Sequence, residues 1–124
     1  MKAVIAAMLL VCASTASACG ICIDDRIASC YDHAVVAGAK AKGQGVAFFA
    51  IEGEIVVKPE TRRAVLKAIE ALPGVLKGTG RVSLENAALS FAFDPSRISA
   101  EAAQRELRLK LQPSRLGVAH LRTL

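Results

Sequence analysis

Six periodic segments after residue 45 limit the possible fold more than any other feature of this 124-residue chain. Four of them have the apolar pattern of strands. Two have the helical repeat, in which apolar residues recur every three or four positions. The strand segments are residues 46–51, 81–84, 89–93 and 118–121, and the helical segments are residues 59–72 and 99–112. The order along the chain is therefore strand, helix, strand, strand, helix, strand.

Residues that begin and end helices support this division. Pro59 lies at a first helical position, where its missing N–H is not needed, and Pro73-Gly74 ends the same helix. Ser99 is a suitable N-cap for the second helix, which Pro113 ends. The β-α-β-β-α-β order predicts an α+β fold, a ferredoxin-like sandwich over residues 46–124.

An additional helix is predicted over residues 21–37, followed by a linker that begins at Gly38 and runs to residue 45. Two acidic residues near the helix start, Asp24 and Asp25, suit the positive end of the helix dipole. Apolar residues at helical spacing give it one continuous stripe. The stripe consists of Ile23, Ile27, Cys30 and Ala34. The sequence thus predicts residues 19–45 as a cysteine-bearing helix and linker.

The first eighteen residues have the pattern of an export signal. A basic start at Lys2 precedes an apolar run, and Ala16-Ser17-Ala18 offers the small residues that a signal peptidase reads. The apolar run is shorter than the about 20 residues that span a bilayer. We therefore expect residues 1–18 to be removed, the protein to be periplasmic or secreted, and the mature chain to lack a transmembrane segment. Lipid anchoring at Cys19 is an alternative outcome of processing.

Three cysteines remain after residue 18, namely Cys19, Cys22 and Cys30. An odd number in an oxidising compartment leaves at least one thiol unpaired within the monomer. No cysteine follows residue 30, so all the sulfur chemistry of the mature chain is confined to its N-terminal part.

Residues 46–121 resemble the heavy-metal-associated (HMA) domain family, whose members include copper chaperones. The similar stretches are VAFFAIEGEI, AVLKAIEALPGV and LSFAFDPSRIS. The resemblance implies a ferredoxin-like fold. It also implies binding of a soft metal ion and a metal-transport or periplasmic protein as partner.

The loop after the first strand departs from that family. Metal-binding members carry two cysteines, two residues apart, in this loop, and alignment puts Lys58 and Thr61 at those positions. Amine and hydroxyl groups cannot supply soft thiolate ligands. The metal site of the family is therefore not carried over, and we expect this loop to hold no metal.

Cys19 and Cys22 form a C-x-x-C at the start of the predicted helix, where unpaired backbone N–H groups favour thiolates. Three interpretations of this pair stay open. It can bind a soft metal such as Cu(I), Zn(II) or Hg(II). It can form a structural disulfide within a non-metal periplasmic interaction module. It can also serve thiol-disulfide exchange, although no strand precedes it as in thioredoxin-like folds.

Cys30 and His33 extend the pair to a C-x2-C-x7-C-x2-H pattern and are further candidate ligands. An intact helix would separate Cys22 from Cys30 by about 12 Å, at roughly 1.5 Å per residue, which one ion cannot bridge. We therefore interpret Cys30 as a buried structural cysteine and His33 as a surface or capping residue. His120 is interpreted as a surface residue of the last strand. Asp24, Asp25 and Asp32 are interpreted as solvated helix residues.

The remaining composition excludes several classes of protein. The formal net charge of +5 comes from scattered basic residues, and the few aromatic residues show no stacking pattern, so nucleic acid is not an expected partner. No nucleophile with a matching acid or base has a recognisable context, so we do not expect an enzyme. The sequence therefore predicts a small exported protein that binds or transfers a soft metal ion.

Overall fold

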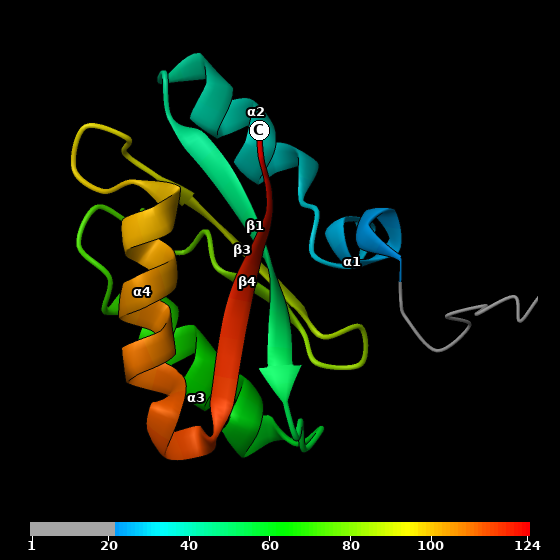
Figure 1. Cartoon of the computed structure of the whole chain (residues 1–124). Coiled ribbons are helices and arrows are strands. Elements are labelled where there is room, and N and C mark those ends of the chain that lie inside the picture. The colour runs from blue at the N-terminus through cyan, green and yellow to red at the C-terminus, as the bar shows by residue number, and fades with distance from the viewer. Residues whose placement is uncertain (1–21) are drawn as a thin grey trace, which may run out of the picture.

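The computed structural model describes residues 22–124 as four helices and a four-stranded antiparallel sheet (Figure 1). The N-terminal part contains α1 (Ile23–Ser29) and α2 (His33–Ala41). It is followed by β1 (Gly45–Gly53), α3 (Pro59–Glu70), β2 (Arg81–Ser83), β3 (Ala88–Phe93), α4 (Ala100–Leu111), a short 3-10 turn (Gln112–Ser114) and β4 (Leu116–Thr123). The export signal and Cys19 lie outside the described residues.

The sheet has the strand order β2-β3-β1-β4, so the first strand in the β-α-β-β-α-β unit lies between the third and the fourth. Phe48 of β1 is opposite Ser90 of β3, and Ile51 of β1 is opposite Val118 of β4. The predicted ferredoxin-like α+β fold is confirmed. The predicted helix starts are also confirmed, because Pro59 opens α3 and the Ser99 hydroxyl accepts a hydrogen bond from the Ala102 N–H.

One face of the sheet carries the main core, and α3 and α4 cover it (Figure 1). Side chains that alternate along the central strands point into this layer. Phe49 and Phe91 stack with ring centroids 5.5 Å apart, and Ile69 of α3 and Leu107 of α4 close over them. All four side chains are fully buried.

The opposite face of the sheet is covered by α1 and α2 (Figure 1). A second apolar cluster fills the space between these helices and the strands. It consists of Ile27, Cys30, Val36, Ala39, Val46, Phe48, Ala88 and Ala92. Because β1 is buried on both sides, its run of apolar residues is explained by two separate cores. The N-terminal helical segment therefore packs on the sheet.

The prediction of one helix over residues 21–37 is wrong, because the chain breaks between α1 and α2. The Asp32 carboxylate accepts hydrogen bonds from the N–H groups of Ala34 and Val35, at 2.9 and 3.3 Å, and so begins a new helix. The Ser90 hydroxyl donates a 2.7 Å hydrogen bond to the Cys30 carbonyl, which is left free by the end of α1. A capping aspartate and a buried hydroxyl thus stabilise the break.

The prediction that Gly38 starts a linker is also wrong. Gly38 lies inside α2, which continues to Ala41. The helix ends before Gly43, whose φ of +67° is the left-handed conformation common after a helix C-terminus. Of the predicted stripe, Ile27 and Cys30 are buried, whereas Ile23 and Ala34 are exposed, because the two helices present different faces to the sheet.

Candidate functional site

Cys22 is the first described residue and the N-cap of α1. Its backbone is extended, with φ −70° and ψ 156°, and its carbonyl accepts the first helical hydrogen bond from the Arg26 N–H at 3.0 Å. The residue is exposed, and its thiol makes no capping hydrogen bond. Cys19, the other half of the C-x-x-C, lies outside the described residues, so the pairing of the two thiols stays a prediction.

Two contacts connect α1 to the rest of the molecule near this cysteine. The Ile27 side chain is buried in the second apolar cluster. The Arg122 guanidinium of β4 lies 3.2 Å from the Asp24 carboxylate, although both side chains are largely exposed. An exposed ion pair of this kind contributes little stability. Burial of Ile27 is therefore the stronger of these two contacts, and it holds α1 at the side of the molecule where Figure 1 shows it.

Cys30 lies at the opposite end of α1 from Cys22 and is buried. Its thiol donates weakly to the carbonyl oxygens of Arg26 and Ile27, at 3.4 and 3.8 Å. Burial raises the pKa of the Cys30 thiol, which opposes formation of the thiolate that metals bind. The eight residue steps from Cys22 to Cys30 correspond to about 12 Å along the axis of α1, at roughly 1.5 Å per residue. The structure therefore does not bring Cys30 to Cys22.

The two histidines lie on different elements of the fold. His33 is the exposed first residue of α2. His120 is exposed on β4, where its Nε2 shares a 2.7 Å hydrogen bond with Thr123 Oγ1 and its ring meets the Phe49 ring edge-on. Within residues 22–124, no group of three or more His, Cys, Asp and Glu side chains could hold a metal ion.

Asp32 differs from the solvated helix residue that the sequence predicts. Besides capping α2, its carboxylate accepts a hydrogen bond from Arg81 Nε of β2 at 3.0 Å. The Arg81 hydrogen bond and the N–H groups of α2 lower the pKa of Asp32 below its usual range. Asp32 therefore connects α2 to the edge of the sheet, whereas Asp24 and Asp25 are exposed in the first turn of α1.

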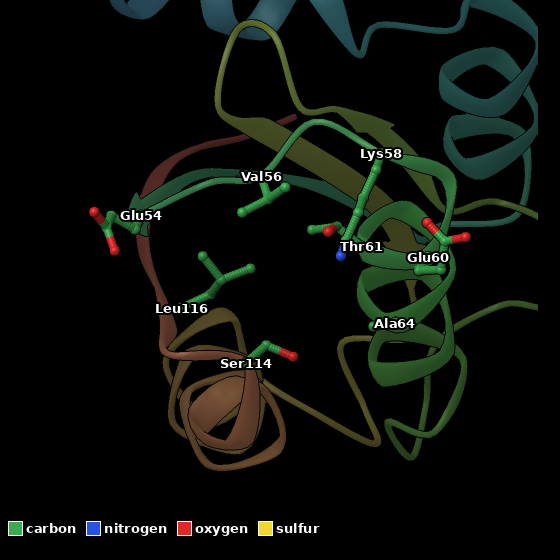
Figure 2. Close-up of a pocket in the computed structure, with 8 residues that line it drawn as sticks. All are labelled: Glu54, Val56, Lys58, Glu60, Thr61, Ala64, Ser114 and Leu116. Atoms are coloured by element: carbon green, nitrogen blue, oxygen red, sulfur yellow. The ribbon is translucent and has the colours of Figure 1, made fainter.

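The loop between β1 and α3 forms a shallow cavity of about 310 Å³ (Figure 2). Lys58 is the N-cap of α3, Thr61 lies in its first turn, and the Lys58 side chain extends toward Thr61. The lining residues are Glu54, Val56, Lys58, Glu60, Thr61, Ala64, Ser114 and Leu116. The side chains at the two aligned positions thus offer an amine and a hydroxyl in place of thiols.

Sequence reasoning missed Ser90, the buried partner of the Cys30 carbonyl. One signal was present: a single hydroxyl stands in the otherwise apolar strand ALSFAF. A polar side chain inside a strand that is buried on both faces must find a hydrogen-bond partner. Its partner could not be read from the sequence, because it is a backbone group 60 residues away.

No helix among residues 22–124 has the length and apolar character needed to cross a membrane. No family model matches the sequence, and no curated protein matches it. Among solved structures, a copper-binding domain from HMA7, a P-type ATPase, superposes with a TM-score of 0.52 at 18% identity, covering 64% of this chain and 96% of that domain.

Two further solved structures have lower TM-scores. Oxidized MerP from Ralstonia metallidurans CH34 has a TM-score of 0.48 at 18% identity, covering 62% of this chain and 96% of its own. The CopZ metallochaperone has a TM-score of 0.46 at 20% identity, covering 60% of this chain and 98% of its own. The superposition on the copper-binding domain shows that the two chains share the ferredoxin-like fold, and this chain has α1 and α2 in front of it.

Proposed function

We propose that this protein is an exported, non-enzymatic carrier that binds a soft metal ion through Cys19 and Cys22. Thiolates are the preferred ligands of Cu(I) and Hg(II), and they also bind Zn(II). The observation that carries the proposal is the exposure of Cys22 ahead of α1, only three positions from a second thiol in the sequence. Two thiolates at this spacing can reach one ion.

The surroundings of the other candidate groups support this choice. Cys30 is buried, and His33 and His120 are on separate elements. The cavity beside Lys58 and Thr61 offers no sulfur ligand. A solved structure with this fold is a copper-binding domain, which favours Cu(I) as the first ion to test. Transfer of the ion to a periplasmic metal-transport protein follows as the role of a carrier with an exposed site.

The test is a competition titration against a chromogenic Cu(I) chelator under reducing conditions. Wild-type protein should withdraw Cu(I) from the chelator, and Cys19→Ser or Cys22→Ser should lower the affinity by orders of magnitude, because a single thiolate cannot close a two-coordinate site. Cys30→Ser should leave the affinity unchanged and act on stability. Lys58→Ala and Thr61→Ala are matched controls in the β1–α3 loop.

Binding that survives replacement of both Cys19 and Cys22 would show that the metal site is elsewhere. Intact mass of the exported chain tests the localisation independently. We expect the chain to begin at Cys19, and an added diacylglyceryl group would identify a lipoprotein. Met1 retained in the soluble cell fraction would contradict export.

A second candidate function is an interaction module without metal. The observation that favours it is a pair of neighbouring valines, Val56 and Val57, that are 56% and 55% exposed in the loop beside the cavity. Exposed apolar side chains that adjoin a hollow are typical of contact sites. Wild-type protein that fails to compete for Cu(I), Zn(II) or Hg(II) would favour this candidate, with Cys19 and Cys22 as a structural disulfide.

A further inference from the structure

β4 is a long edge strand of the sheet. It covers eight residues, from Leu116 to Thr123, and within residues 22–124 its only neighbouring strand is β1. The opposite edge strand, β2, is three residues long. An unpaired edge offers a row of N–H and C=O groups to which another strand can bind. The shortness of β2 limits such pairing there, whereas β4 is long enough to accept a whole strand.

Two side chains of α4 bind the outward groups of β4. The Gln104 Oε1 accepts a 2.9 Å hydrogen bond from the His120 N–H, and the Arg108 Nε donates a 2.9 Å hydrogen bond to the Val118 carbonyl. Gln104 and Arg108 are four positions apart, so they lie on one side of α4, which runs next to β4 (Figure 1). Both hydrogen bonds lie outside the β1–β4 ladder.

The register agrees with this orientation. Ile51 is opposite Val118, and the Ile51 N–H bonds to the Ala87 carbonyl on the far side of β1. In an antiparallel pair, the N–H and C=O of one residue point to the same side, and directly opposite residues alternate between bonded and non-bonded pairs. Val118 and, two positions later, His120 therefore direct their backbone groups away from β1.

The His120 N–H and the Val118 carbonyl, which α4 binds, would bond to each other between two copies in a symmetric pairing. If two β4 strands lie antiparallel about Ala119, Val118 of one copy is opposite His120 of the other. The His120 N–H of each copy then donates to the Val118 carbonyl of its mate, which is the geometry of a bonded antiparallel pair. A two-fold interface of this kind is self-complementary. Such a pair also uses the Val118 N–H and the His120 carbonyl, so α4 occupies one donor and one acceptor of the four backbone groups that each copy would contribute.

We propose that the β4 edge is a strand-pairing surface for a second copy of this chain, and that Gln104 and Arg108 keep it closed. The Gln104–Arg108 pair satisfies the same two groups intramolecularly and fills the space in which the second strand would lie. The chain then stays monomeric although its sheet has a long free edge. This inference is independent of the proposed metal site, because it uses neither Cys22 nor any other residue of α1.

The test is the solution mass of the double variant Gln104→Ala with Arg108→Ala, measured by sedimentation velocity with a reducing agent to exclude disulfide dimers. We expect the mass to double at high protein concentration, whereas the unmodified chain stays monomeric. The matched control is Arg105→Ala with Leu109→Ala. These residues are exposed on the same helix with the same spacing, and the charge change is the same. This control should stay monomeric.

A third change locates the interface. His120→Pro removes the outward N–H, which β1 does not use, and proline is tolerated on such an edge. Added to the double variant, it should return the protein to a monomer. A folded double variant that stays monomeric, or a dimer that persists with His120→Pro, overturns the proposal. If the double variant does not fold, hydrogen exchange of the His120 amide in the unmodified chain decides. Exchange at the rate of an exposed amide would show that Gln104 does not hold the edge closed.

Discussion

Replacing Val36 with alanine tests whether the N-terminal helices belong to the folded core. Val36 of α2 is 5% exposed and packs in the second apolar cluster, opposite Phe48 and its neighbours on the sheet. The same replacement is available at an exposed position, because Val56 in the β1–α3 loop is 56% exposed. The two variants change the same atoms in opposite environments, which makes the comparison specific for burial.

The expected magnitude follows from three contributions. Removing two buried methyl groups costs about 1.6 kcal/mol of transfer free energy, at about 0.8 kcal/mol each. The cavity that remains adds roughly 0.5 kcal/mol, because the sheet below can relax only in part. Alanine favours the helix over valine by about 0.5 kcal/mol, which offsets the cavity. We therefore expect Val36→Ala to lower the free energy of unfolding by about 1.5 kcal/mol, and Val56→Ala to change it by less than about 0.5 kcal/mol.

Urea denaturation monitored by circular dichroism measures both values. If α1 and α2 unfold together with the sheet, Val36→Ala should lower the midpoint and leave the slope unchanged, because the surface exposed on unfolding is the same. A loss below about 0.5 kcal/mol for Val36→Ala would refute the reasoning, since surface substitutions usually change stability by no more than that and alanine is favoured in an exposed helix. It would mean that α2 does not bury Val36 on the sheet in solution.

Four other outcomes follow from the described contacts. With the other cysteines replaced by serine, the Cys30 thiol should react with a disulfide reagent far more slowly than free cysteine does, because burial raises its pKa and blocks access. Gly38→Ala should raise the melting temperature, since nothing lies near its added Cβ and alanine favours the helix by roughly 0.5–1 kcal/mol. Gly53→Ala should lower it, because φ is +108° and the Cβ would lie 2.5 Å from a backbone oxygen. The hydrogen bond from Arg81 lowers the pKa of Asp32 in the folded chain. The ionised Asp32 carboxylate therefore stabilises the fold above about pH 4, the usual pKa of an unfolded aspartate. This stabilisation disappears as the pH falls through the lower pKa of the folded state. The difference in urea midpoint between wild type and Asp32→Asn should therefore be large at neutral pH and vanish in acid.

The sequence predicts the ferredoxin-like part well because its boundaries are marked by local chemistry. Pro59 fixes the start of α3 and the Ser99 hydroxyl caps α4, and both signals act within one helical turn. The strands follow from apolar runs whose burial is uniform, as in β3. Such features depend on residues close together in the chain, so they can be read without knowing the fold.

The break between α1 and α2 depends on a competition that the apolar pattern does not reveal. A stripe from Ile23 to Ala34 favours one helix, but Asp32 can cap a second one and then also reaches Arg81, 49 positions later. Capping and the distant ion pair prevail, and only Ile27 and Cys30 of the stripe are buried. The hydrogen bonds of Gln104 and Arg108 to β4 also could not be predicted from the sequence, because they depend on how α4 lies beside β4.

The apolar pattern of β1 indicates that both faces of the sheet are covered. An antiparallel sheet with one face in water alternates apolar and polar residues, yet β1 is apolar from Val46 to Ile51. Val46 and Phe48 are buried by α1 and α2, whereas Phe49 and Ile51 are buried by α3 and α4. A strand that is apolar on both sides therefore requires two covering layers.

Because both faces of the sheet are occupied, a partner of the described part has few apolar contacts to use. The exposed large apolar residues are Ile23, Tyr31, Val56, Val57, Leu109 and Leu124. Among them, Ile23 directly follows Cys22, so the only exposed thiol of residues 22–124 has an apolar neighbour at the surface. A protein that accepts an ion from the proposed Cys19–Cys22 site must approach α1, and Ile23 gives that approach a hydrophobic contact.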